Sequence, residues 1–511
     1  MSDTFYITTP IYYPNGDPHL GSVYTTVICD VLARYHRLLG EPTYFLTGTD
    51  EHGLKMAKAA AAEGAEPQAL ADKYSAVFQN LWRELKISND DFIRTTEVRH
   101  KHAVGKIVEK MLSKGDIYLG SYEGWYDEGQ EQFITETEAR SSDYKSPISG
   151  RPLSRYKEPT YFFRLTKYVP ALIAYIEQHE NFVIPHARRN EVLSKLREDV
   201  QDLSISRATL KWGIPMPHDP SHVLYVWIDA LTNYITALGY GSDDDSLFKR
   251  FWPGTHIIGK DILWFHAVYW PAMLLSLDLP FPNQIAAHGW WTAEGKKMSK
   301  SLGNVIDVAK IRQLSAAHGL DAIRYYLLRA APFGSDLDWS EQDFSKSFNE
   351  LANVLGNLLN RTLNMLNKYR GGVLPAAKPS EQIDHDLKSK TEQLSTAIAE
   401  AYSKLNLQEV ALLPIELARA ANGYIDATRP FSLAKDPAQA ERLNTVLNLS
   451  SQATKTALAA LLPVLPEKCA AGLEQLGVDV NATSLTQLLQ QELPSGHQAK
   501  AGTPLFPRQI N

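Results

Sequence analysis

The strongest constraint on the fold is an alternation of strand-like and helix-like segments that is interrupted once and then resumes. Within residues 1–116, a strand-like run at 5–7 is followed by the turn residues 15–18 and a helical repeat that begins just beyond His19-Leu20-Gly21. A second strand-like run follows at 44–47. Strands separated by helices pack as a parallel sheet covered by helices. We therefore predict an α/β fold with a Rossmann-like parallel sheet.

The alternation stops between residues 117 and 221. Short aromatic-rich strands, Ser and Gly clusters and a helix near residues 168–179 predict an inserted connective domain there. The α/β pattern returns over 222–345, with strands expected at 224–228, 256–258 and 284–287. Leucine and alanine then recur at helical spacing, so 346–511 is expected to form an α-helical domain with a C-terminal tail.

Bulk properties exclude several classes of protein. No apolar run approaches the roughly 18 to 20 residues that cross a bilayer, and the N-terminus lacks the pattern of a signal peptide. Only Cys29 and Cys469 are present, far apart in sequence, which gives neither a disulfide framework nor the four-ligand spacing of a structural zinc site. A net charge of −6 argues weakly against non-specific binding to nucleic acid, although locally basic surfaces remain compatible with it. We expect a cytoplasmic protein without membrane segments.

Two short segments have the residue types of a phosphate site. His19-Leu20-Gly21-Ser22 lies at a strand-to-helix junction, where backbone N–H groups and the helix dipole attract anions. Lys297-Met298-Ser299-Lys300-Ser301 follows Gly295 and could close over a polyphosphate as a mobile cationic loop. Each has an ordinary alternative, a helix-capping histidine for the first and a solvated basic loop for the second.

In this order, on the two halves of a split sheet, the segments resemble the HIGH and KMSKS signatures of class I aminoacyl-tRNA synthetases. Residues 12–16, 47–53, 225–230 and 258–271 further resemble methionyl-tRNA synthetases, so the resemblance covers nearly the whole chain. It implies a ligase that activates methionine with ATP and transfers it to the 3′ end of tRNA(Met). Mg²⁺ is expected to accompany ATP.

The resemblance also implies which residues form the site. Asp50 is expected to receive the α-ammonium group of methionine, and Arg207 to pair with Asp50 across the site, because a buried carboxylate needs such a partner. An unbranched, polarizable thioether suits an aromatic pocket. The expected methionine-binding residues are Ile11, Tyr13, Asp50, Arg207, Trp227, Ala230, Tyr234, Ile262, Phe265, His266 and Trp270. For Trp227 and Trp270, plain core packing is the alternative.

ATP and the anticodon are assigned in the same way. The expected ATP-binding residues are His19, Gly21, Ser22, Gly259, Asp261 and Lys300, with His19, Lys297 and Lys300 as the catalytic groups. Asp261 could equally cap a helix. The expected anticodon-binding residues are Asn353, Asn357, Arg361 and Phe431. Asn357 and Arg361 are four residues apart and therefore share a helix face.

Three departures from the family pattern limit these assignments. Ser22 replaces the second histidine of the first signature, and Phe431 replaces a stacking tryptophan, which removes ring area and the indole N–H. The inserted domain lacks the cysteine pairs of a zinc knuckle. Asp127, Gln130, Ser146 and Ser149 stand at those positions. Serine and glutamine cannot replace thiolates as tight zinc ligands, so no metal site is expected.

Other class I enzymes fit less well. Leucyl, isoleucyl and valyl enzymes need a larger editing insertion, and a cysteinyl enzyme needs thiolate zinc ligands. A non-catalytic relative that binds tRNA or a protein partner is the remaining alternative. The presence of His19, Asp50, Arg207 and Lys300 argues against it. The chain ends soon after the helical domain, without an appended tRNA-binding domain, so a monomer is expected.

Overall fold

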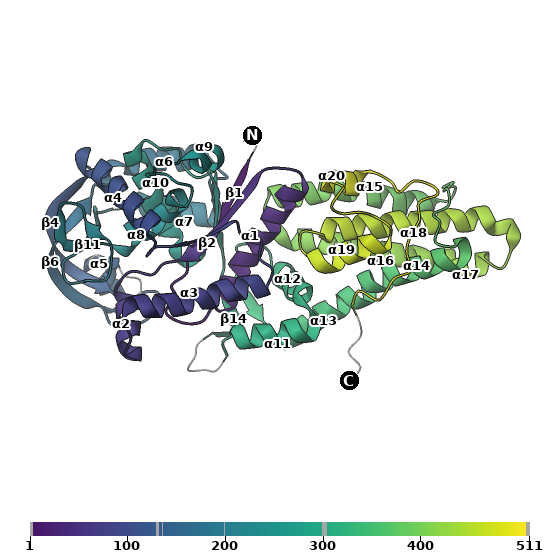
Figure 1. Ribbon diagram of the computed structural model, residues 1–511, viewed down its shortest axis with the longest axis horizontal. Coiled ribbons are helices and arrows are strands. Elements are labelled where there is room, and N and C mark those ends of the chain that lie inside the picture. Colours follow the sequence, from purple (N-terminus) through teal and green to yellow (C-terminus); the bar gives the residue numbers. More distant parts are fainter. Residues whose placement is uncertain (1–3, 129–131, 135, 199, 299–303, 507–511) are drawn as a thin grey trace. The chain divides into compact units, whose positions relative to one another are not determined.

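The computed structural model describes residues 4–128, 132–134, 136–198, 200–298 and 304–506. The chain divides into two compact units, whose elements are labelled in Figure 1. Unit 1 comprises residues 1–33 and 42–289, and unit 2 comprises residues 34–41 and 290–511. Helix α1 (Leu20–Leu38) begins in unit 1 and ends in unit 2. Residues 290–345, which the sequence places with the catalytic sheet, belong to unit 2.

Unit 1 is built on a six-stranded sheet in the order β3-β2-β1-β12-β13-β7. Every neighbouring pair is parallel, which confirms the predicted Rossmann-like sheet. Strand β7 comes from the 117–221 range, so this range also contributes to the main sheet. The strands are β1 (Phe5–Thr8), β2 (Thr43–Thr49), β3 (Asp91–Arg94), β7 (Val183–Ile184), β12 (Thr255–Gly259) and β13 (Gln284–His288).

Helices of unit 1 connect and cover these strands. They are α2 (Leu54–Glu63), α3 (Pro67–Glu84), α4 (Val98–Ser113), α5 (Glu136–Ser141), α6 (Val169–Gln178), α7 (His186–Leu196), α8 (Val226–Thr236), α9 (Ser246–Phe251) and α10 (Trp270–Leu277). Short helical turns lie at η1 (Leu165–Lys167) and η2 (Lys260–Ile262), and a π-helix at η3 (Phe265–Tyr269). Helix α6 agrees with the helix expected near 168–179.

The strand expected at 224–228 is wrong. Strand β11 ends at Leu224, and the apolar residues that follow begin helix α8. All eleven residues of α8 are buried. A short, continuous apolar run suits a buried strand and a buried helix equally, so periodicity could not separate the two.

The inserted range forms two small antiparallel sheets. One has the order β5-β4-β6-β8 and the other β10-β11-β9. Their bounds are β4 (Ile117–Asp127), β5 (Gln132–Ile134), β6 (Ser154–Phe163), β8 (Leu203–Ser204), β9 (Ser206–Arg207), β10 (Pro215–Met216) and β11 (Asp219–Leu224). These are the short strands that the aromatic-rich pattern predicts.

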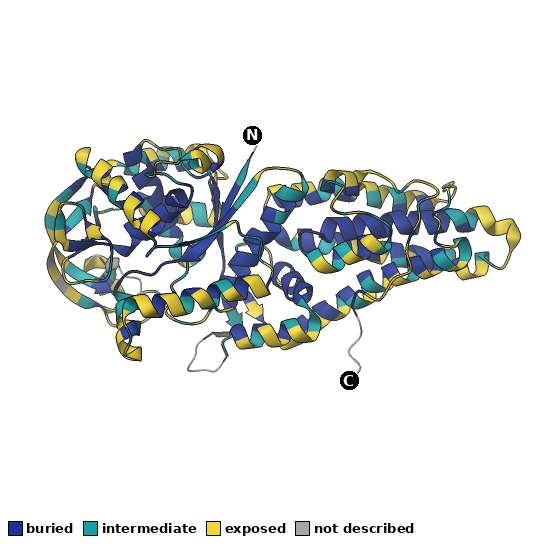
Figure 2. Cartoon of the chain, viewed as in Figure 1, coloured by how far each residue is buried: buried dark blue, intermediate teal, exposed yellow. Residues whose placement is uncertain are grey.

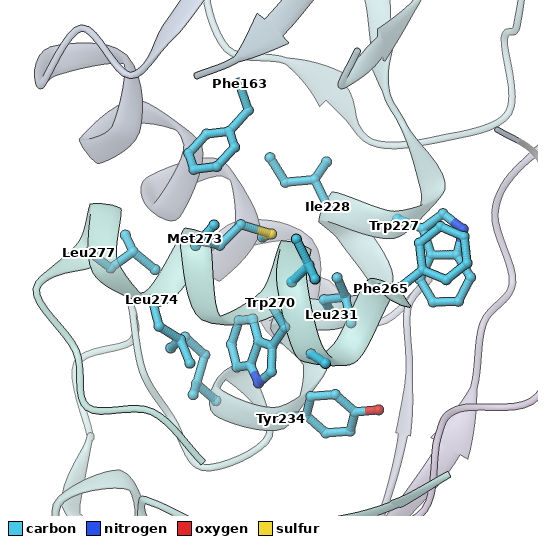
Figure 3. Packing of buried hydrophobic residues seen from close by; sticks show 14 of the residues in the cluster. Phe163, Trp227, Ile228, Leu231, Tyr234, Phe265, Trp270, Met273, Leu274 and Leu277 are labelled. Carbon is cyan, nitrogen blue, oxygen red and sulfur yellow. The ribbon is translucent and has the colours of Figure 1, made fainter. Parts of the chain in front are cut away.

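A large hydrophobic cluster fills unit 1, and α8 and α10 contribute many of its residues. Figure 3 shows Ile228 and Leu231 of α8 facing Met273 of α10, with Trp270 and Tyr234 nearby. Helix α8 is buried on all sides, including the face that carries its polar residues. The aromatic residues expected to bind methionine therefore lie on helices that the core already holds in place.

Unit 2 is mainly helical. Its helices are α11 (Val308–His318), α12 (Leu320–Arg329), α13 (Glu341–Glu350), the π-helix η5 (Leu351–Gly356), α14 (Asn357–Arg370), α15 (Gln382–Ser403), α16 (Leu407–Thr428), α17 (Pro430–Leu433), η6 (Pro437–Gln439), α18 (Ala440–Leu461), α19 (Pro466–Gln475) and α20 (Leu485–Gln490). A small sheet, β15-β14-β16, joins β14 (Trp291–Ala293), β15 (Lys296–Lys297) and β16 (Leu337–Trp339).

Helix α18 forms the centre of the bundle. It packs against α14, α15, α16 and α19, and it is buried along most of its length (Figure 2). The expected helical domain is confirmed, because no strand follows β16 among the described residues. None of the described helices is both long and apolar enough to cross a bilayer.

Candidate active site

The first signature forms the N-terminus of α1. His19 is the residue before the helix, and its ring Nδ1 accepts a hydrogen bond of 3.1 Å from the Gly21 backbone N–H. The Ser22 hydroxyl accepts from the His19 N–H at 3.0 Å and donates to the His19 carbonyl at 2.7 Å. This reciprocal capping holds the turn. A Cβ atom at position 21 would lie 3.0 Å from the His19 ring, closer than an ordinary contact, so glycine leaves room for the ring in this place.

Capping also determines the proton position on His19. Because Nδ1 accepts a hydrogen bond, the neutral ring carries its proton on Nε2. The ring is exposed to solvent, yet the surrounding protein lowers the pKa of His19, and the charge of Asp261 opposes that shift. Ser22, in contrast, is buried and uses its hydroxyl proton within the turn. Of these two side chains, His19 is the better placed to donate to a phosphate.

Gly259 and Asp261 lie where strand β12 ends. A Cβ atom at position 259 would come within 2.6 Å of the Asp261 carboxylate, so this carboxylate lies directly against the Gly259 backbone. Asp261 also influences the pKa of His19, which places the expected ATP-binding residues of unit 1 within one region. The carboxyl ends of parallel strands are where open α/β sheets bind ligands.

Sequence reasoning missed two polar residues in the same region. His288, at the end of β13, lies 2.7 Å from the Thr25 hydroxyl through its Nε2 atom and 2.8 Å from the Gly289 carbonyl through Nδ1. Burial lowers the pKa of His288, so the neutral ring donates from Nδ1 and accepts from Thr25. No motif contained these residues. Their one sequence signal was the position of His288 at the end of an expected strand.

The aromatic residues of α8 and η3 meet face to face. Figure 3 shows the rings of Trp227 and Phe265 stacked on each other. Their centroids are 3.7 Å apart and their planes are inclined by 6°. The His266 ring lies edge-on to Trp227 at 6.2 Å. A π-helix such as η3 offsets consecutive side chains from the α-helical phase and often occurs at functional sites. Here it directs Phe265 and His266 toward α8.

Two buried histidines in this cluster are neutral. His266 donates from Nδ1 to the Ile262 carbonyl at 2.9 Å, so its Nε2 accepts the Tyr234 hydroxyl at 2.7 Å. Burial lowers the pKa of His266 to about 4. His256 accepts the Trp270 indole N–H at 3.2 Å, and burial lowers its pKa as well. The pocket is therefore uncharged at this end, as a thioether requires.

The structure brings together most of the residues expected to bind methionine. Trp227, Tyr234, Phe265 and Trp270 belong to one buried cluster, against which the partly buried Ile11, Tyr13 and Ile262 pack. Ala230 lies between Trp227 and Tyr234 in sequence on the same buried helix. The core-packing alternative for Trp270 is also satisfied, because its side chain is fully buried.

Asp50 lies directly after β2 and is 3% exposed. Its backbone N–H donates to the Tyr12 carbonyl at 2.9 Å, which fixes it beside the segment that carries Ile11 and Tyr13. Burial raises the pKa of Tyr234, and the negative charge of Asp50 adds to that shift. Asp50 is therefore within electrostatic reach of the aromatic pocket.

Arg207 is buried on β9. Its guanidinium lies over the Tyr225 ring at 4.5 Å and the Tyr126 ring at 5.3 Å, and its Nη1 donates to the Ser204 hydroxyl at 2.9 Å. Tyr225 is the residue before α8, so Arg207 contacts the start of the helix that carries Trp227. The expected pairing of Arg207 with Asp50 stays a prediction.

The second signature is described only in part. Lys297 is the last residue of β15, in unit 2, and Lys300 lies outside the described residues. The role expected for these lysines therefore rests on the sequence.

The residues expected to read the anticodon lie in unit 2. Asn353 and Asn357 are exposed, on η5 and α14. Arg361 pairs with Asp426 of α16 at 2.5 Å. Phe431 of α17 is 50% exposed, so its ring is not part of the core. An exposed aromatic ring offers a face on which a nucleic-acid base can stack.

In the inserted domain, hydrogen bonds close a turn at residues 146–150. The buried Ser146 hydroxyl accepts from the backbone N–H groups of Ser149 at 3.0 Å and Ile148 at 3.3 Å. The turn closes through the Gly150 N–H, which donates to the Ser146 carbonyl at 2.9 Å. Gln130 lies outside the described residues. No group of three metal-ligating side chains occurs among the residues that the structure describes.

Comparison with known proteins shows the family to which the chain is similar. The family profile described as "tRNA synthetases class I (M)" matches residues 5–150 and 139–363. A methionine–tRNA ligase of Enterococcus faecalis is 45% identical over 99% of this chain and 77% of its own length, and that of Bacillus subtilis is 44% identical over 99% and 78%.

Solved structures agree equally well. Methionyl-tRNA synthetase of Mycobacterium tuberculosis in complex with methionyl-adenylate superposes with a TM-score of 0.95 at 39% identity, covering 99% of this chain and 100% of that one. The free form of the Mycobacterium tuberculosis enzyme gives a TM-score of 0.87 at 35% identity, covering 100% and 99%. From its sheet, its signature segments and these relatives, the chain belongs to the methionyl-tRNA synthetase family of class I aminoacyl-tRNA synthetases.

Proposed function

We propose that the chain acts as a methionine–tRNA ligase through the residues described above. The observation that carries this proposal is the combination, within unit 1, of a neutral aromatic pocket, a buried carboxylate at Asp50 and a glycine turn at the N-terminus of α1. These three features match the thioether, the ammonium group and the phosphates of the reactants.

In the first step, the methionine carboxylate attacks the α-phosphorus of ATP. Methionyl-adenylate forms, and pyrophosphate is the leaving group. The attacking carboxylate is already ionised, so positioning and charge stabilisation dominate over base catalysis. Asp50 holds the ammonium group, and the aromatic pocket holds the thioether. His19 donates from Nε2 to the polyphosphate, and Lys297 and Lys300 supply positive charge.

In the second step, a terminal ribose hydroxyl of tRNA(Met) attacks the carbonyl carbon of the adenylate, and AMP leaves. We assign anticodon binding to Asn353, Asn357, Arg361 and Phe431 of unit 2. Residues 1–116 and 222–345 would form the catalytic domain, 117–221 the connective domain and 346–511 the anticodon-binding domain.

Mg²⁺ is proposed to arrive with ATP. It prefers oxygen ligands and retains several waters, so the polyphosphate itself would hold most of it. The exposed Asp261 has the oxygen donors for an outer contact. When bound, the ion would neutralise charge on the phosphate oxygens.

Pyrophosphate exchange tests the activity directly. The purified protein is expected to incorporate labelled pyrophosphate into ATP when methionine is present, and not when leucine, isoleucine or valine replaces it. A non-catalytic tRNA-binding relative would give no exchange with any amino acid. Absence of methionine-dependent exchange would therefore reject the proposed function.

The purified protein is also expected to contain no stoichiometric zinc. Serine hydroxyls at positions 146 and 149 are poor zinc ligands, and Ser146 already accepts two backbone hydrogen bonds. Elemental analysis should find well below one zinc per chain, and activity should survive a strong chelator once Mg²⁺ is restored. One tightly held zinc per chain would contradict this prediction.

A cytoplasmic monomer is the form proposed for the active protein. Sedimentation at several concentrations checks the oligomeric state, and a dimer that forms with rising concentration would refute the monomer.

A further inference from the structure

Three buried side chains outside the site residues assigned above form one network. His52 Nδ1 donates to one carboxylate oxygen of Asp229 at 2.6 Å, and His100 Nε2 donates to the other at 2.7 Å. His52 is 3% exposed, and His100 and Asp229 are completely buried. The other nitrogen of His100 lies 2.7 Å from the Thr236 hydroxyl.

Asp229 is ionised in this network. Burial acts to raise the pKa of Asp229, but the adjacent His52 and His100 lower it to about 2. Asp229 also lies in the first turn of α8, where the helix dipole favours a negative charge. A buried carboxylate with both oxygens bonded to imidazole rings is rigidly held.

The segment that carries Asp50 is anchored residue by residue. The buried Glu51 carboxylate accepts from Arg94 of β3, through Nε at 2.6 Å and Nη2 at 3.0 Å. His52, the next residue, is anchored to Asp229 of α8. Gly53 then adopts a φ of +98°, which turns the chain into α2. The backbone at Asp50 therefore takes its position from β3 on one side and α8 on the other.

Helix α8 also carries the pocket for the methionine side chain. Trp227, Ala230 and Tyr234 flank Asp229 within the same helix. The contact between His52 and Asp229 thus joins the segment that bears the carboxylate for the ammonium group to the helix that bears the thioether pocket. The contact therefore connects the element proposed to bind the ammonium group of methionine with the element proposed to bind its thioether.

We propose that Asp229 is a positioning residue that acts through His52 to fix the distance between the Asp50 carboxylate and the methionine side-chain pocket on α8. This inference rests on the proposed role of Asp50 as the ammonium-binding residue. His52 and Asp229 are both shielded from solvent, so they act by holding Asp50 at a fixed position relative to α8.

Asp229→Asn tests the inference in the pyrophosphate exchange assay. The amide keeps the size of the side chain but removes its charge and turns one acceptor into a donor that faces an imidazole N–H. The KM for methionine is expected to rise about tenfold, from loss of one charge-assisted hydrogen bond, while kcat and the KM for ATP change less than about threefold. An unchanged KM for methionine would overturn the inference.

Asp384→Asn is the matched control. Asp384 is also completely buried, accepts the Tyr424 hydroxyl at 2.7 Å and pairs with Arg442 at 2.7 Å, but it lies in unit 2. Its substitution should lower the melting temperature and leave the KM for methionine in exchange unchanged. An equal rise of this KM in both variants would mean that general destabilisation explains the effect, and would reject the positioning role.

Substitutions at His52 keep the test informative if Asp229→Asn does not fold. His52→Asn retains a side-chain N–H close to the place of Nδ1, whereas His52→Ala removes the donor. The KM for methionine should stay within about threefold of the parent in His52→Asn and rise about tenfold in His52→Ala. The same KM in both variants would contradict the proposed contact.

A methionine analogue without the ammonium group separates this inference from the proposed function. Inhibition of exchange by 4-(methylthio)butanoic acid should be equal in the parent and in Asp229→Asn, because the analogue does not use Asp50. If Asp50→Asn itself leaves the KM for methionine unchanged, the ammonium site is wrong. If Asp50→Asn raises that KM and Asp229→Asn does not, only the positioning role is wrong.

Discussion

Replacing Asp50 by asparagine is expected to lower kcat/KM for methionine in pyrophosphate exchange by about 30- to 4000-fold. Removing one partner of a buried charge pair costs about 2 to 5 kcal/mol, at ~1.4 kcal/mol per tenfold change. Asp50 is 3% exposed, so bulk water cannot solvate the ammonium group in its place. The KM for methionine should rise sharply, and the KM for ATP should change little. Initial rates of exchange at varied methionine and varied ATP measure both.

Asp30→Asn is the matched control for this variant. Asp30 is also a buried carboxylate of unit 1, but it accepts from Ser88, through the backbone N–H at 2.7 Å and the hydroxyl at 2.6 Å. Its substitution should lower the melting temperature and keep the KM for methionine. If both variants lose methionine affinity equally, or if Asp50→Asn keeps it, Asp50 does not bind the ammonium group.

Replacing Lys300 by alanine is expected to reduce kcat of exchange by about 10²- to 10³-fold, the usual effect of removing one group aimed at transition-state charge. Binding of tRNA through the anticodon should survive, because the expected anticodon residues lie elsewhere in the chain. Single-turnover adenylate formation and a tRNA filter-binding assay on the same variant measure the two effects. Unchanged exchange would exclude Lys300 from catalysis.

Replacing Phe431 by alanine should produce the opposite pattern. Loss of one base-stacking surface costs about 1 to 3 kcal/mol, so charging of tRNA should fall by about 5- to 150-fold. Exchange without tRNA should barely change. Because Phe431 is 50% exposed, its loss should leave the melting temperature nearly unchanged. Equal loss of charging and exchange would reject the anticodon role.

The sequence predicted contiguous features well. The parallel sheet and the helical C-terminal half were each predicted from runs of neighbouring residues, and the structure and the relatives confirm them. The roles of the two signature segments stay predictions. The expected strand at 224–228 failed for a physical reason. The run 224–228 is short and entirely apolar, and such a run suits a buried strand and the first turn of a buried helix equally.

The sequence also could not predict what Ser22 does. As a residue of the first signature it was expected to contact the nucleotide, but in the structure its hydroxyl caps the turn by bonding both backbone groups of His19. Short polar side chains near a helix N-terminus often bond to the local backbone. A second contact, from the Gly21 N–H to His19 Nδ1, places the proton of neutral His19 on Nε2.

The sequence by itself determined the family and the reaction, because the residue types that bind phosphate, ammonium and thioether groups occur in short motifs of fixed order. The tertiary structure alone decided which of these groups are held together. His52 and His100 are 177 and 129 residues from Asp229 along the chain, and both bond to the same carboxylate. Such a contact has no local pattern, since it arises only when distant elements pack and exclude the water that would otherwise satisfy each polar group.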